Sequence, residues 1–229
     1  MENKEIKYLV YDLETTGLNL EKSKICQIAA LFITTTEKEE ISQPKAMYCK
    51  PNLTDWEWNS TYVKQALEVN HTTKEMLSDK VDEGIAIDRF LKLIMDFKPD
   101  YIIGQNQIKF DNMLLINRLK QLNVFNSYSS ILDIPNLDTK VISYKLLSNI
   151  KNNKLETLAK HFGIEQINAH DAINDVEVTY AVFKKLQELM TENLSNYSIP
   201  MSKTMYFAED ATQIISLNKS NPFAKLVKS

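Results

Sequence analysis

Acidic residues stand at three places in this 229-residue chain where an acid is out of keeping with its neighbours. Asp12 and Glu14 interrupt an apolar run near the start, Asp111 opens a leucine-rich segment, and Asp175 lies shortly after His170. Hard divalent cations such as Mg²⁺ bind carboxylate oxygens, and pairs of these ions promote displacement at phosphorus. If folding brings the four acids and the histidine together, the chain has the residues for metal-dependent cleavage of phosphodiesters.

Asp12 and Glu14 are two residues apart in a segment with a strand pattern, so their side chains point to the same face, and Leu13 points to the other. A carboxylate pair on one face repels itself unless a cation lies between its members. The alternative is an acidic strand end exposed to solvent. Gly17 then permits a tight turn, whose backbone amides could closely approach a terminal nucleotide.

Asp111 heads a helical face on which leucines follow at positions 115, 119 and 122. A buried charge on such a face needs a partner or a metal ion. The alternative is an acid in the first turn of a helix, where the helix dipole stabilises it. Position alone leaves both interpretations open for Asp111.

Asp175 heads a second apolar face, which continues with two valines and a leucine at helical spacing. Asp171 is better placed to cap the start of that helix, since its side chain can accept hydrogen bonds from backbone amides. His170 precedes the helix and is suited to act as a general base that takes a proton from water. A histidine in such a place is also often structural or merely exposed.

The rest of the chain shows three strand patterns in succession and then mostly helical patterns. Because no helical segment separates the first three strands, we expect an antiparallel meander within a mixed sheet that helices cover. The expected strands are Ile6–Tyr11, Ile25–Thr35, Ala46–Lys50 and Tyr101–Gly104, and a further small strand is a candidate just before the helix that begins at Lys140. The expected helices are Thr61–Val69, Glu83–Phe97, Phe110–Leu122, Lys140–Leu147, Leu155–Phe162 and Ala172–Met190.

Two segments carry weaker patterns. Pro51–Ser60 is expected to be a loop, in which Trp56 and Trp58 either stack on bases or, the favoured interpretation, pack onto the core. Residues 1–194 are expected to form one domain and residues 195–229 an arm. The arm is expected either to dock a partner, to cover a substrate channel or to pack on its own domain.

Composition narrows the function classes. The net charge of −3 and the lack of a polybasic run argue against a protein that wraps nucleic acid by electrostatics alone. No apolar stretch approaches the ~20 residues of a membrane helix, and the polar N-terminus does not resemble a signal peptide. Cys26 and Cys49 are expected to be small buried residues. The cytoplasm is the expected compartment.

Taken together, the three acidic segments resemble the motifs of the DnaQ-like DEDDh exonucleases, which have a ribonuclease H-like fold. The motif D-x-E-T-T-G matches Asp12–Gly17, the second motif matches Gly104–Asp111, and H-x-A-x-x-D matches His170–Asp175. Lys154–Ile164 and the residues after it look similar to the exonuclease domain of bacterial exonuclease I. The chain departs from proofreading subunits at Gln107, where those usually have asparagine, and it is too short for the additional domains of exonuclease I.

The resemblance implies an α/β fold with a five-stranded mixed sheet, one strand of which is antiparallel to the rest, flanked by helices. It also implies a site for two Mg²⁺ or Mn²⁺ ions. The implied metal ligands, which are also the implied catalytic acids, are Asp12, Glu14, Asp111 and Asp175.

The resemblance further implies how the site would use these residues. His170 would be the general base, the backbone around Thr15 and Thr16 would hold the terminal 3′ nucleotide, and Leu18 would pack against the end bases. The expected reaction releases nucleoside 5′-monophosphates from 3′ ends.

The expected partner is a nucleic acid 3′ end, with single-stranded DNA favoured. RNA trimming is an alternative, and so is a polymerase-associated proofreading or interaction module. DNA replication, DNA repair and RNA turnover all use this chemistry. A protein partner or a homodimer is compatible with the sequence, whereas a membrane is not expected.

Overall fold

The structure is a computed structural model of the chain. No helix in the part that it describes is both long and apolar enough to cross a bilayer. The described residues are 5–37, 39–165 and 172–196, with side chains at all of these except 129 and 191–196.

Several predictions from the sequence concern residues outside these ranges. His170 and Asp171 both lie outside the described residues, so the proposed base and the proposed helix cap stay predictions. The last helix continues to Asn196, two residues beyond the expected domain boundary. Residues 197–229 lie outside the described part, and the expected arm therefore also stays a prediction.

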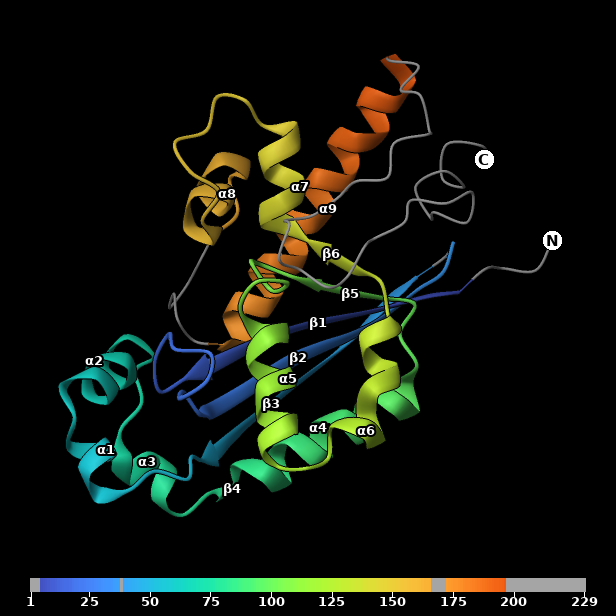
Figure 1. Ribbon diagram of the computed structural model, residues 1–229. Coiled ribbons are helices and arrows are strands. Elements are labelled where there is room, and N and C mark those ends of the chain that lie inside the picture. Colours follow the sequence, from blue (N-terminus) through green and yellow to red (C-terminus); the bar gives the residue numbers. More distant parts are fainter. Residues whose placement is uncertain (1–4, 38, 166–171, 197–229) are drawn as a thin grey trace.

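The described strands form one mixed sheet of six strands in the order β4-β3-β2-β1-β5-β6 (Figure 1). β2 is antiparallel to both of its neighbours, and the other pairs are parallel, so β2 alone runs against the rest. The single antiparallel strand and the meander are confirmed, but the count of five was wrong. The sixth strand is β4, whose two residues are too few to produce a pattern. The strands are β1 Ile6–Thr15, β2 Ile25–Thr35, β3 Glu40–Lys50, β4 Val81–Asp82, β5 Tyr101–Gly104 and β6 Asn136–Asp138.

Two strands are longer than predicted. β1 continues to Thr15, because Asp12 and Glu14 pair with Ala29 and Gln27 of β2 instead of ending the strand. β3 begins six residues earlier than predicted and contains Pro44, whose missing amide is tolerated because this part of β3 is a sheet edge.

Helices cover both faces of the sheet (Figure 1). Those between β3 and β4 lie beyond one end of it, beside the β1–β2 loop. The helices are α1 Asp55–Asn59, α2 Thr61–Val69, α3 Lys74–Ser78, α4 Glu83–Phe97, α5 Asp111–Gln121, α6 Phe125–Tyr128, η1 Ser129–Asp133 (a 3₁₀ helix), α7 Thr139–Leu146, α8 Leu155–Phe162 and α9 Ala172–Asn196.

The alternation of β1 divides its side chains between two cores. Leu9, Tyr11 and Leu13 pack with residues of α4 and α5, whereas Tyr8 and Val10 pack with residues of α7, α8 and α9. Because side chains alternate along a strand, positions 12 and 14 share the face of α9. The predicted common face of the two acids is therefore confirmed, and it is the face on which α9 begins.

The segment expected to be a loop before α2 contains the short helix α1. Thr54 and Glu57 form a reciprocal capping box at its start, a signal that the sequence carries. Trp58 is buried in a small core with the α2 side chains Val63 and Leu67. Trp56 is 80% exposed, so core packing is confirmed for Trp58 and wrong for Trp56.

Candidate active site

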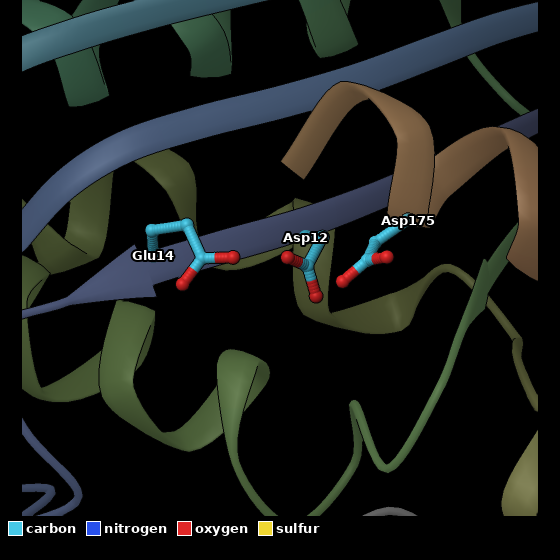
Figure 2. Close-up of side chains that lie close together, drawn as sticks. All are labelled: Asp12, Glu14 and Asp175. Atoms are coloured by element: carbon cyan, nitrogen blue, oxygen red, sulfur yellow. The ribbon is translucent and has the colours of Figure 1, made fainter. Parts of the chain in front are cut away.

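Three acids from two distant parts of the chain meet at the end of β1. One carboxylate oxygen from each of Asp12, Glu14 and Asp175 lies within 4.8 Å of the others. Figure 2 shows Asp12 between the other two, with Asp175 reaching in from the first turn of α9. Asp12 and Asp175 are partly buried and Glu14 is buried, so this arrangement is not a fully solvated acidic surface.

Asp175 occupies its place because α9 packs on the sheet with the predicted apolar stripe. Val178, Val182 and Leu186 are all buried in the core on this face. Burial of the stripe orients α9, and Asp175, one turn before Val178, is thereby turned toward β1. The prediction that this acid heads a buried stripe is confirmed.

Asp111 is the first residue of α5 and is 4% exposed. Its Oδ1 accepts a hydrogen bond of 3.1 Å from the backbone amide of Leu13, the residue between the two acids of β1. Asp111 thus lies in the first turn of a helix and is also buried on its apolar side. The two interpretations of its position are therefore compatible. It adjoins the cluster of Asp12, Glu14 and Asp175 without belonging to it.

The electrostatics show how closely these acids are crowded. Burial, reinforced by the negative charge of Asp175, raises the pKa of Asp12 to about 7. Burial and then the charge of Asp12 hold the pKa of Asp111 well above its usual range. The charge of Asp175 thus opposes the ionisation of Asp12, and the charge of Asp12 opposes that of Asp111. A divalent cation among these oxygens would remove that repulsion, and oxygen donors of this type suit Mg²⁺ or Mn²⁺.

Another buried acid, Asp138, organises the loop that leads into α5. Its carboxylate accepts hydrogen bonds from the amides of Asn106 at 2.9 Å, Ile108 at 3.2 Å and Lys140 at 3.0 Å. Asn106 has a positive φ of 61°, a conformation that is uncommon outside glycine but that asparagine adopts more readily than most residues. Asp138 was missed from the sequence, although an acid between an apolar strand and a helix start is a recognisable cap signal.

The residues after Glu14 form a compact loop, in which the hydroxyl groups of two threonines form hydrogen bonds with the backbone of the loop. Thr15 Oγ1 donates to the carbonyl oxygen of Gly17 at 2.7 Å, and Thr16 Oγ1 accepts from the amide of Lys24 at 2.9 Å. Both threonines are buried, whereas Leu18 is 79% exposed at the tip of the loop. The structure thus presents Leu18 outward and uses both threonine hydroxyls within the loop.

Two residues of the α2 region support this loop and were missed from the sequence. Asn70 Nδ2 donates to the carbonyl oxygen of Thr15 at 2.9 Å. The ring of Tyr62 lies against Gly17, so close that a Cβ at position 17 would stand 2.0 Å from it. No periodic pattern could have revealed contacts between residues more than 40 positions apart.

Comparison with known proteins agrees with this geometry. Residues 9–183 match the model of the RNase_T exonuclease family. The chain belongs to this DnaQ-like exonuclease family. The matched residues include all four acids of the site.

Among curated proteins, similar relatives of this chain are PolC-type DNA polymerases III. The enzyme of Clostridium perfringens is 25% identical over an alignment 236 residues long, which covers 96% of this chain and 15% of that protein. The enzyme of Staphylococcus epidermidis is 25% identical over 202 residues, which cover 88% of this chain and 13% of that protein. The chain therefore spans less than a sixth of these relatives.

Among solved structures, E. coli exonuclease I is similar in fold. Its complex with a dT13 oligonucleotide matches with a TM-score of 0.66 and 26% identity over 83% of this chain and 43% of that one. A zinc-bound form in complex with single-stranded DNA matches with a TM-score of 0.64 and 25% identity over 84% of this chain and 45% of that one. The expected ribonuclease H-like fold is confirmed.

Proposed function

We propose that this chain is a 3′–5′ exonuclease that removes nucleoside 5′-monophosphates from single-stranded DNA with the help of two divalent ions. The observation that carries the proposal is the meeting of Asp12, Glu14 and Asp175 within 4.8 Å, with Asp111 beside them. Buried acids crowd in this way where a cation balances their charge.

The four acids would hold Mg²⁺ or Mn²⁺. When bound, the ions would supply the polarisation of the phosphate and the activation of water that two-metal hydrolysis requires. Asp12 stands at the centre of this set, since the charge of Asp175 raises its pKa and its own charge raises the pKa of Asp111.

We assign the remaining roles to the other residues of the exonuclease motifs. We assign to His170 the removal of the proton from the attacking water, a role that a neutral imidazole fills near pH 7. Leu18, exposed at the rim of the site, would pack against the last bases, and the backbone of Thr15 and Thr16 would face the terminal nucleotide. Attack of water breaks the bond from phosphorus to the 3′ oxygen and leaves the phosphate on the released nucleotide.

Single-stranded DNA is the favoured substrate because exonuclease I, which resembles this chain in fold, binds such oligonucleotides. Grip on a strand end also suits a chain of net charge −3, since a long tract of phosphates would call for a basic surface. The cytoplasm remains the compartment that we expect.

The proposal is tested with 5′-labelled oligonucleotides of one sequence, prepared as single-stranded DNA, duplex DNA and RNA. We expect a ladder that shortens from the 3′ end by one nucleotide at a time, with Mg²⁺ or Mn²⁺ and not with excess chelator. Single-stranded DNA should be degraded fastest, and a blocked 3′ end should protect it.

Each other outcome has a definite meaning. Faster loss of the RNA would replace the substrate with RNA and keep the mechanism. Cleavage that persists in chelator, or that begins at the 5′ end, would contradict the proposal. Asp12→Ala is the negative control, because it removes the central acid of the cluster.

A second candidate is a proofreading module that works beside a polymerase, favoured by the similarity to PolC-type polymerases. It predicts a preference for mispaired over paired 3′ ends. Equal rates of cleavage at matched and mismatched primer termini would argue against proofreading. A homodimer is a separate question, which sedimentation of the purified chain would answer.

A further inference from the structure

The β1–β2 loop, residues 16–24, is held from two sides. It lies between α2 and α5 (Figure 1), and it carries Leu18 at its exposed tip. Loops of this kind often close only when a ligand binds. Side-chain hydrogen bonds from α2 and α5 fix this loop to the body of the protein without a ligand.

Helix α5 holds the inner side of the loop with side-chain amides. Asn117 Nδ2 donates to the carbonyl oxygen of Leu20 at 3.1 Å. One turn later, Gln121 Nε2 donates to the carbonyl oxygen of Glu21 at 2.8 Å. Both bonds join residues about 100 positions apart in the sequence, so they set tertiary and not local structure.

A buried ion pair supports the same side of the loop. Arg118 Nε and Nη2 bind the carboxylate of Glu83 at 2.7 and 2.6 Å, with both side chains at most 5% exposed. Glu83 Oε1 also accepts from the amide of Ile25 at 2.8 Å, where the loop re-enters the sheet. Arg118 Nη1 in addition donates to Gln121 Oε1, which orients the amide that binds the loop.

Tyr62 of α2 holds the outer side. Its hydroxyl accepts from the amide of Asn19 at 2.7 Å and lies 3.3 Å from Ser23 Oγ. Its ring also closes against Gly17. The residues on both sides of Leu18 are therefore fixed by tertiary contacts.

Helix α5 connects this loop to the acids. Its first residue, Asp111, is bonded to Leu13 in the middle of the acidic motif, and Asn117 lies six residues further along, about 9 Å at 1.5 Å per residue. A helix is stiff over this length, so α5 fixes the separation between the acids and the loop.

We propose that Asn117 and Gln121 are positioning residues, which hold Leu18 at a set distance from the acids so that the strand end meets a preformed site. This inference rests on the proposed function and deepens it. A preformed loop avoids the entropy of ordering on binding. Its loss should therefore weaken substrate binding and leave the chemical step nearly unchanged.

The test replaces both amides by apolar side chains of similar size, as Asn117→Leu with Gln121→Met. With single-stranded DNA and Mn²⁺, we expect KM to rise about fivefold or more and kcat to stay within about twofold. The Mn²⁺ concentration for half-maximal rate should not move. Gln43→Met, the same change on the exposed edge of β3, is the matched control and should alter nothing. If the double variant does not fold by circular dichroism, Asn117→Leu alone takes its place.

A double-mutant cycle with Leu18→Ala shows whether the amides act through Leu18. We expect Leu18→Ala to raise KM by itself, and the added amide changes to raise it no further. Three outcomes would overturn the inference and leave the nuclease assignment standing. In the first, the KM effects of Leu18→Ala and of the two amide changes multiply when they are combined. In the others, the amide changes leave KM unchanged or lower kcat alone. A wild-type chain that cuts no nucleic acid would instead overturn the proposed function, and this inference with it.

Discussion

The carboxylate of Asp111 accepts a hydrogen bond from the backbone amide of Leu13, at 3.1 Å. Leu13 lies between Asp12 and Glu14 in β1, so this bond fixes the start of α5 to the middle of the acidic motif. It also places the Asp111 carboxylate close enough to Asp12 for the charge of Asp12 to raise the pKa of Asp111. The site is therefore assembled by one sheet strand and two helix starts, and a change in any of the three should be felt at the others.

Replacing the central acid tests the assignment of the site. Asp12→Asn keeps the size of the side chain and removes the charge. We expect the rate of metal-dependent cleavage to fall by about 100-fold or more. The reason is that the loss of an ion-binding charge removes several kcal/mol of transition-state stabilisation. Single-turnover degradation of a labelled oligonucleotide measures the effect. Asp96→Asn, on the exposed side of α4, is the matched control and should retain full activity.

The crowding of acids should make the metal-free protein less stable at high pH. The pKa of Asp12 is raised from 3.8 to about 7 in the folded protein, so the folded state holds this proton more tightly than the unfolded chain does. The free energy of unfolding should then fall as the pH rises from about 4 to about 7, by on the order of 4 kcal/mol. Melting the chelated protein at pH 5.5 and pH 8 measures this, with the lower melting temperature expected at pH 8.

Two further melts separate this cause from others. Asp12→Asn should be more stable than the wild type at pH 8 in chelator, since the repulsive charge is gone. Millimolar Mg²⁺ should raise the melting temperature of the wild type at pH 8 more than that of the variant, because an ion that binds the folded state stabilises it. Equal stabilisation of both proteins by Mg²⁺ would argue against an ion at Asp12.

Residues that act through local patterns could be predicted from the sequence. α8 ends at Gly163, whose φ of 67° is the left-handed conformation that the glycine predicts. β2 and α4 have the predicted bounds, since long apolar patterns define them. The four acids were recognised because each heads or interrupts such a pattern.

Residues that act through tertiary contacts could not be predicted in this way. Arg118 follows Leu114 and Leu115 on the buried side of α5, and nothing in the sequence tells that its partner is Glu83, 35 residues earlier. The contact of the Tyr62 ring with Gly17 likewise depends on where α2 packs in the folded protein. The capping box of α1 is different, because Thr54 and Glu57 form a local signal that the sequence itself carries.

The buried ion pair of Arg118 and Glu83 should be important for stability. Arg118→Ala leaves the Glu83 carboxylate buried without its cation, so we expect the free energy of unfolding to fall by about 3–5 kcal/mol. Chemical denaturation measures the loss. Replacing both residues, as Arg118→Met with Glu83→Gln, should restore part of it, because no charge is then left unpaired.

An exposed ion pair on α4 is the matched control. Lys92 Nζ binds Asp88 Oδ2 at 2.7 Å, with the two side chains 66% and 43% exposed. Water solvates these charges when the pair is broken, so Lys92→Ala should leave the denaturation midpoint unchanged. If Arg118→Ala and Lys92→Ala lowered the free energy of unfolding equally, burial would not explain the contribution of Arg118 to stability.

Gly17 should tolerate no side chain while Tyr62 is in place. Its φ of 150° is rare for other residues, and a Cβ would lie 2.0 Å from the Tyr62 ring. Gly17→Ala should therefore displace the loop that carries Leu18, with a loss of about 2 kcal/mol in stability and a higher KM for single-stranded DNA. In the Tyr62→Ala background the collision is gone and only the backbone strain remains, so Gly17→Ala should there lower stability by clearly less. An undiminished loss in that background would mean that backbone conformation, and not the tyrosine, requires glycine at this position.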